Sequence, residues 1–119
     1  MLNDSDSEAV AAYTQLWNFF EHEKQEMAYS KIFSSNRIFD LAGGIAITTL
    51  AKVIGHLVTE GVIDQIVRVE PAYGQGIGDF DSIEDVPEIL DDWRNPGNVV
   101  HVQYDHLKIY YKLHMNAAS

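Results

Sequence analysis

Apolar residues recur at steps of three and four near the start of the chain, which is the spacing of one face of an α-helix. Asp6 or Ser7 suits the N-cap position, and Glu8 follows where a negative charge is favourable against the helix dipole. The pattern predicts a long amphipathic helix that runs to about Tyr29, with polar residues on its outer side. The residues expected to face inward are Val10, Tyr13, Leu16, Trp17, Phe20 and Met27.

Two further helices and a strand are predicted next. The cap-forming residues 34–36 precede a short helix over 37–42, and the glycine pair at 43–44 closes it. A third helix over about 48–60 ends at a glycine in the C-cap position and passes directly into a β-branched strand over 62–69. The third helix is expected to bury Leu50, Ile54, Leu57 and Val58.

The second half of the chain is richer in turns and strands. Residues 71–78 contain too much glycine for a regular element, and the run at 74–78 favours a flexible hinge. A short helix is predicted over 86–93, a turn over 95–98, and strands with alternating apolar residues over 99–113. The short helix is expected to face inward through Ile89, Leu90 and Trp93.

Length and composition indicate one globular domain. The chain has 119 residues, of which 46% are hydrophobic and 22% are charged, as in ordinary folded proteins. We expect a single domain over residues 8–113, with frayed ends at 1–7 and 114–119. No cysteine is present, which excludes disulfides, thiolate zinc sites and a cysteine nucleophile.

The charge of the chain bears on its partners. Eight Lys and Arg against eighteen Asp and Glu give a net charge of −10, which repels nucleic acid and anionic membranes at long range. No window approaches the roughly 18 consecutive apolar residues of a membrane span, and the acidic N-terminal segment lacks the basic lead of a secretory signal. We therefore expect a cytoplasmic protein without membrane contact, in which DNA binding is disfavoured by charge.

The order of these elements, together with the segment Leu-Val-Thr-Glu-Gly-Val-Ile at 57–63, resembles the winged helix-turn-helix family. In that family the third helix ends in Leu-x-x-x-Gly, followed by two apolar residues that lead into a wing hairpin. The resemblance covers about residues 30–113. It implies an α+β winged helix of three helices and a β-hairpin wing, here with a long N-terminal helix and an enlarged acidic wing insertion over 74–98.

The same resemblance implies which surface a DNA-binding relative would use. In such a relative the exposed face of the third helix enters the major groove. In this chain the corresponding residues are Thr48, Thr49, Lys52, His56 and Thr59.

The segment 79–92 carries seven acidic residues and no basic one. It does not fit a calcium loop of the EF-hand type, because positions six and twelve counted from Asp79 are Glu84 and Leu90 instead of Gly and Glu. Exposed carboxylates beside apolar side chains are typical of a docking surface for a basic partner. The candidate partner-binding residues are Asp79, Phe80, Asp81, Asp85 and Asp91.

Catalytic and metal-binding patterns are missing from the sequence. The five histidines are dispersed, no nucleophile stands with a base and an orienting acid, and the glycine-rich run at 74–78 lacks the Lys-Ser/Thr of a phosphate-binding loop. The sequence therefore predicts a protein that is not an enzyme and that has no metal or cofactor.

Two functional hypotheses remain. In the first, the domain is an adaptor or regulatory protein-interaction module that accompanies a larger effector. In the second, it is a DNA-binding transcriptional regulator that uses the helix at 48–60. The few scattered basic residues, Arg37, Lys52 and Arg68, favour the first hypothesis. The broad aromatic stripe of the first helix also predicts a homodimer through that helix.

Overall fold

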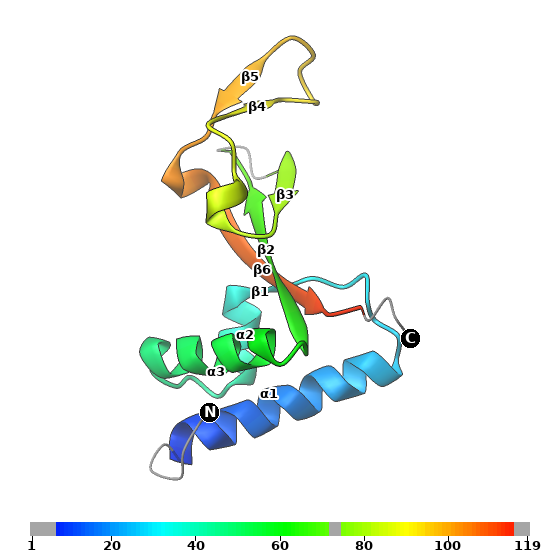
Figure 1. The fold of residues 1–119 in the computed structure, drawn as a ribbon, viewed down its shortest axis with the longest axis vertical. Helices are drawn as coiled ribbons and strands as arrows, with labels where there is room; N and C mark the ends of the chain where they lie inside the picture. The colour runs from blue at the N-terminus through cyan, green and yellow to red at the C-terminus, as the bar shows by residue number, and fades with distance from the viewer. Residues whose placement is uncertain (1–6, 72–74, 116–119) are drawn as a thin grey trace. The chain divides into compact units, whose positions relative to one another are not determined.

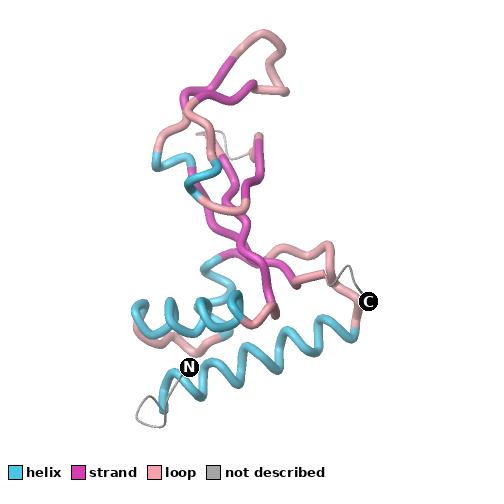
Figure 2. The backbone as a smooth tube through the Cα atoms, viewed as in Figure 1, coloured by secondary structure: helices cyan, strands magenta, loops and turns pink. Residues whose placement is uncertain are grey.

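The structure is a computed structural model and describes residues 7–71 and 75–115 (Figure 1). Within these residues it is α+β, with three α-helices, a four-stranded sheet and a two-stranded sheet (Figure 2). The chain groups into two compact units. Among the described residues, the helical unit comprises 7–64 and 111–115 and the β unit comprises 65–71 and 75–110, and each is described by itself.

Helix α1 (Ser7–Gln25) ends four residues before the predicted end, because the chain turns at Met27 with a φ of 57°. The Met27 N–H donates to the Lys24 carbonyl and the Ala28 N–H donates to the Glu23 carbonyl, both at 3.0 Å. These are the two hydrogen bonds of a Schellman motif, which normally has glycine at the left-handed position.

The face that α1 buries is also rotated from the predicted one. The inward placement of Leu16 and Phe20 is confirmed, but the helix also packs on its neighbours through two small residues that were not predicted to face inward. The buried residues are Ala9, Ala12, Leu16 and Phe20. The inward placement of three other residues was wrong, because the structure exposes Val10, Trp17 and Met27.

Helix α2 (Ser35–Leu41) confirms the short helix, which starts two residues before the predicted start and ends one residue before the predicted end. Strand β1 (Phe33–Ser34) leads into it, and the Ser34 hydroxyl caps it by accepting a hydrogen bond of 3.2 Å from the Arg37 N–H. A second Schellman motif closes the helix at Gly43, whose φ is 85°.

Helix α3 (Ile47–Thr59) and the strand after it also follow the prediction. Gly61, with a φ of 74°, ends the helix in a third Schellman motif, and the Val62 N–H donates to the Leu57 carbonyl at 2.9 Å. The predicted buried face was partly wrong, since Val53 lies in the core while Val58 is exposed.

The core of the helical unit is built from α1, α2, α3 and short strand segments. Three phenylalanines pack edge to face, with ring centroids 5.3 to 5.6 Å apart. The Gln15 amide also donates a hydrogen bond of 2.7 Å to the Leu41 carbonyl, which joins α1 to the end of α2. The three aromatic residues are Phe19, Phe20 and Phe33.

The four-stranded sheet has the order β1-β6-β2-β3. Strands β2 (Ile63–Val69) and β6 (Leu107–Leu113) contribute residues to both units. In the β unit, β3 (Gly78–Phe80) pairs antiparallel with β2, so that Arg68 lies opposite Asp79. Strand β3 extends into the acidic segment 79–92 through Asp79 and Phe80.

The prediction of a short helix over residues 86–93 was wrong. Strands β4 (Ile89–Asp91) and β5 (Val99–His101) instead form an antiparallel hairpin, in which Leu90 lies opposite Val100. The expected turn over 95–98 is present, because the Asn98 N–H donates to the Asn95 carbonyl at 3.0 Å. Two short 3-10 helices, η1 (Ile83–Asp85) and η2 (Tyr104–His106), complete the β unit.

Some predictions fall outside the described residues. The expected frayed ends fall mostly on residues 1–6 and 116–119, and part of the glycine-rich hinge falls on residues 72–74. The described part of that stretch includes Ile77, whose N–H donates to the Val69 carbonyl at 2.9 Å.

Candidate functional site

The β4–β5 hairpin exposes large apolar side chains. Ile89 is 50% exposed and Val99 is 51% exposed, and Trp93 in the connecting turn is 61% exposed. The register pairs Ile89 with His101 and Asp91 with Val99, so that Ile89 and Val99 lie on the same face of the hairpin. We call these three exposed residues, Ile89, Trp93 and Val99, the hairpin surface.

The opposite face of the hairpin packs toward β3. A Cβ atom at Gly78 would lie 3.5 Å from the Leu90 Cδ1 atom and 3.1 Å from the Phe80 ring. Leu90 is accordingly half-buried, as is Val100 across from it. The hairpin therefore has one packed face and one exposed face, and the exposed face carries Ile89 and Val99.

A buried carboxylate fixes the turn that carries Trp93. Asp92 is buried, and its Oδ1 atom accepts hydrogen bonds from the backbone N–H of Arg94 at 3.1 Å and from Arg94 Nε at 3.0 Å. The Asn95 amide donates to Asp92 Oδ2 at 3.3 Å, and the Asp92 N–H donates to the Asn98 carbonyl at 3.0 Å. The exposure of Trp93 is thus a property of an ordered turn.

The five acidic-segment candidates lie on three elements of the β unit. Asp79 and Phe80 stand in β3, Asp85 in η1 and Asp91 in β4, with Asp81 just after β3. Asp81, Asp85 and Asp91 are exposed, and Phe80 is half-buried. The acidic character of this region is evident from the sequence. The exposure of Ile89, Trp93 and Val99 was not predicted, because Ile89 and Trp93 were expected in a helix and Val99 in a strand without an assigned partner.

Asp79 forms an ion pair with an arginine of the neighbouring strand β2. Arg68 donates two hydrogen bonds to Asp79, from Nε to Oδ1 at 2.7 Å and from Nη2 to Oδ2 at 2.9 Å. This contact is the largest cause of a raised pKa for the Arg68 guanidinium. Asp79 therefore holds β3 against β2, and Arg68 is engaged in that pair.

Arg68 also lies against an aromatic ring. Its Cζ atom is 5.1 Å from the centroid of the Tyr110 ring, and the Tyr110 hydroxyl donates a hydrogen bond of 2.5 Å to Glu70 Oε2. That hydrogen bond, followed by burial, raises the pKa of Tyr110. Four side chains thus link β2, β3 and β6 within the β unit.

The residues that the resemblance assigns to a DNA-facing surface all lie on or at the end of α3. Thr48, Lys52 and Thr59 are exposed, whereas Thr49 and His56 are half-buried. The structure therefore brings them to one helix, and Lys52 is the single Lys or Arg among its thirteen residues. Apolar residues share the outer side of α3, since Ile47 is 70% exposed and Val58 is 38% exposed.

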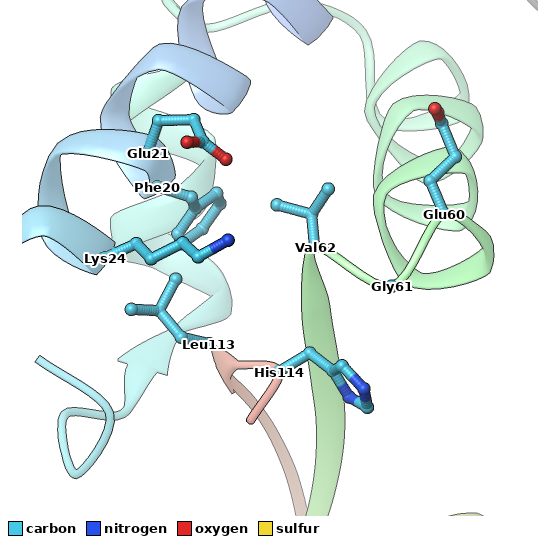
Figure 3. A pocket seen from close by; sticks show the side chains of 8 residues that line it. All are labelled: Phe20, Glu21, Lys24, Glu60, Gly61, Val62, Leu113 and His114. Atoms are coloured by element: carbon cyan, nitrogen blue, oxygen red, sulfur yellow. The ribbon is translucent and has the colours of Figure 1, made fainter. Parts of the chain in front are cut away.

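A small pocket lies in the helical unit, where α1 faces the turn between α3 and β2 and the end of β6 (Figure 3). Its volume is about 200 Å³, which is below the range of about 300–1,000 Å³ typical of ligand pockets. Lys24 points toward Val62, and the Phe20 ring lies beside the Lys24 side chain (Figure 3). The full lining is Phe20, Glu21, Lys24, Glu60, Gly61, Val62, Leu113 and His114.

On one side of the pocket, the end of β6 contacts the start of β2. The His114 N–H donates to the Val62 carbonyl at 3.1 Å, and His114 Nδ1 lies 2.9 Å from Asp64 Oδ1. These contacts tie the end of β6 to the start of β2. The pocket residues therefore serve the packing of the helical unit, and the hairpin surface is the stronger candidate for function.

No helix in the described part of the chain is long and apolar enough to cross a membrane. Within the same residues, no group of three or more His, Asp or Glu side chains gathers in a way that could hold a metal ion. No protein-family model matches the chain, and neither the search of curated proteins nor the search of solved structures found a match.

Proposed function

We propose that this chain is a non-enzymatic protein-interaction module, built on a winged-helix plan, whose hairpin surface binds a basic segment of a partner protein. The observation that carries the proposal is the exposure of Ile89, Trp93 and Val99 on an ordered hairpin in an acidic part of the chain. The partner is thereby defined by its chemistry, namely Lys or Arg side chains beside an apolar anchor.

The apolar part of the surface supports protein binding. A turn fixed by the hydrogen bonds of Asp92 presents Trp93 to solvent, and tryptophan is enriched among the residues that dominate binding energy at protein interfaces. Ile89 and Val99 extend the apolar area on the hairpin. Exposed apolar side chains at positions close in the hairpin, beside polar groups, are typical of interaction sites.

The charge around the surface supports a basic partner. Residues 65–110 contain nine Asp and Glu but three Lys and Arg. Two of the three basic residues are engaged within the unit, Arg68 with Asp79 and Arg94 with Asp92. The unit therefore presents a negative field, which speeds encounter with a positively charged segment and disfavours acidic partners.

The order of elements in the described residues supports the winged-helix part of the proposal. Helix α1, strand β1, and helices α2 and α3 are followed by β2, and Gly61 makes the passage from α3 to β2. The wing would correspond to β2 and the strands that follow it, enlarged by the β4–β5 hairpin. In this reading α3 is a helix of the core and not a DNA-reading element, because its outer side is largely apolar.

The test is capture of partners by the tagged protein from its native lysate, with nuclease treatment in parallel and readout by mass spectrometry. The hairpin variant carries Trp93→Ser and Val99→Ser. The matched control carries Val10→Ser and Trp17→Ser, which remove one Val and one Trp from exposed positions on α1. The proposal expects a protein that survives nuclease, is lost with the hairpin variant and is retained by the control.

Salt provides the second arm of the test. Binding to a basic segment should weaken as sodium chloride rises from about 50 mM to about 500 mM, because the Debye length shrinks over that range. Asp81→Asn with Asp91→Asn should weaken binding in the same way at low salt. Capture of nuclease-sensitive DNA that is lost with Lys52→Glu would overturn the proposal in favour of a transcriptional regulator.

A further inference from the structure

Helix α3 carries two apolar stripes. The first, made of Leu50, Val53 and Leu57, is buried in the helical unit. The second lies on the outer side, where Ile47 is 70% exposed, Val58 is 38% exposed, Ala51 is exposed and Ile54 is half-buried. We call the second set, Ile47, Ala51, Ile54 and Val58, the outer stripe.

The spacing of the outer stripe is that of a helix-pairing seam. Its residues follow one another at steps of four, three and four, as do the apolar residues at the contact line of a coiled coil. The buried stripe shows the same alternation of steps, three then four, and it is covered by the helical unit. The outer stripe is therefore a second packing face whose geometry suits another α-helix.

The outer stripe is complementary to itself. If a second α3 lies antiparallel across it, centred between Lys52 and Val53, Ile47 faces Val58 of the other copy and Ala51 faces Ile54. Each contact then occurs twice, as a two-fold axis requires. A small residue opposite a large one at the centre lets the two helices interlock.

Charge also favours a second copy at this place. Residues 41–59 contain no Asp or Glu, although the chain has eighteen such residues and a net charge of −10. Two copies repel one another wherever carboxylates meet, as they would at the β4–β5 hairpin. The outer stripe is a place where two acidic chains can approach without that repulsion, because α3 contains no Asp or Glu. Its one Lys or Arg, Lys52, lies to the side of the seam.

We propose that the outer stripe pairs with the outer stripe of a second copy of this chain, antiparallel, to form a homodimer. A helix of 13 residues is about 20 Å long, so the contact is short by the standard of permanent interfaces. The dimer is accordingly weak and depends on protein concentration. The proposal stands independently of the hairpin surface, which lies in the other unit.

Sedimentation velocity over a concentration series, from low micromolar to near millimolar, tests the dimer. Ala51→Glu places two carboxylates near the dimer axis and should raise the dissociation constant at least about tenfold. Gly55→Gln adds bulk beside the seam at a position where a Cβ meets nothing within 4 Å in the monomer, so it should weaken pairing without harm to folding. Circular dichroism melts verify that both variants fold.

Thr59→Glu is the matched control, because it adds the same charge to an exposed position of α3 away from the stripe. It should leave the dissociation constant within about twofold of the starting value. A chain that stays monomeric throughout the series, or equal effects of Ala51→Glu and Thr59→Glu, would overturn the proposal.

Cross-linking tests the antiparallel register, since the chain has no cysteine of its own. Ile47→Cys and Val58→Cys variants, mixed and treated with a short bis-maleimide, should cross-link to one another faster than either links to itself. Faster self-linking of each variant would show a parallel pair and contradict the register. No linking in any mixture, with free thiols confirmed by titration, would count against pairing through this stripe.

Discussion

The Tyr13 hydroxyl on α1 donates a hydrogen bond of 2.7 Å to Glu60 Oε1, at the residue that caps the end of α3. Burial, and then this hydrogen bond, raise the pKa of Tyr13 to about 12 from an ordinary value of 10.0. One polar contact between residues 47 positions apart therefore joins the two longest helices of the helical unit.

Tyr13→Phe should destabilise the fold by about 0.5–1.5 kcal/mol, because it removes this hydrogen bond and leaves most of the ring packing in place. The value is expected near the lower end, since Glu60 is exposed. Chemical denaturation measures this loss of unfolding free energy, and the m-value should be the same for the variant and the wild type. Glu60→Gln, which leaves an acceptor for the hydroxyl, should cost less than Tyr13→Phe.

The same pair has a signature at high pH. The folded pKa of Tyr13 is raised, so the folded state holds the phenolic proton more tightly than the unfolded state does. This contribution is complete below the unfolded value of 10.0 and is lost as the pH rises through about 12. The difference in unfolding free energy between the wild type and Tyr13→Phe should shrink over that window. A difference that stays constant up to pH 12 would contradict the assignment.

Met27 and Gly61 occupy the same left-handed position after two helices, with φ values of 57° and 74°. Met27→Gly should stabilise the fold by about 0.5–1 kcal/mol, because the strain it relieves exceeds the entropy that glycine adds to the unfolded chain. The Met27 side chain is 77% exposed, so little packing is lost. Gly61→Ala should cost about 1–2 kcal/mol.

Denaturant midpoints of the two variants check this pair of opposite shifts. Met27→Ala is the control, because it shortens the side chain and keeps the strain. If Met27→Ala stabilises the fold as much as Met27→Gly does, the effect comes from loss of the side chain and not from relief of backbone strain.

Features encoded by neighbouring residues could be read from the sequence. The end of α3 follows from Gly61, and the start of α2 follows from Ser34, because each acts on the backbone within three or four residues. The end of α1 could not be read in this way. Its Schellman motif uses Met27, a residue without the conformational preference of glycine.

Features that depend on distant partners were missed. Residues 89–91 are a strand because Val99, Val100 and His101 pair with them, and no local pattern reports that pairing. The candidate site has the same limitation. Its acidic composition was visible in the sequence, whereas the engagement of Asp79 by Arg68 and the exposure of Trp93 are set by the folded β unit.

Asp92→Asn should loosen the β4–β5 hairpin. The buried carboxylate accepts charge-assisted hydrogen bonds from Arg94, and a neutral amide would replace them poorly, at a cost of about 1.5–3 kcal/mol. Amide hydrogen exchange should become faster at Asn98 and in β4 and β5. The exchange rates of amides in the rest of the described chain should change less. Asp91→Asn removes the same charge from an exposed position of β4 and should leave protection unaltered. Equal effects of the two variants would show that net charge, not the buried contact, governs the hairpin.

Glycines 55 and 76 should respond to alanine in opposite directions. A Cβ at Gly55 in α3 meets nothing within 4 Å, so Gly55→Ala should stabilise the helix by about 0.5–1 kcal/mol. A Cβ at Gly76 would lie 2.7 Å from Arg68 Cδ. Arg68 has little freedom to move away, because Asp79 holds its guanidinium and Tyr110 lies against it.

Gly76→Ala should therefore cost about 1–3 kcal/mol, the usual range for overpacking. A double-mutant cycle with Arg68→Ala separates this clash from any backbone effect at position 76, since truncation of Arg68 removes the atoms that the new Cβ would meet. We expect the cost of Gly76→Ala to fall to near zero in the Arg68→Ala background. If the full cost remains there, the backbone at Gly76 sets the requirement for glycine, and Arg68 is not the cause.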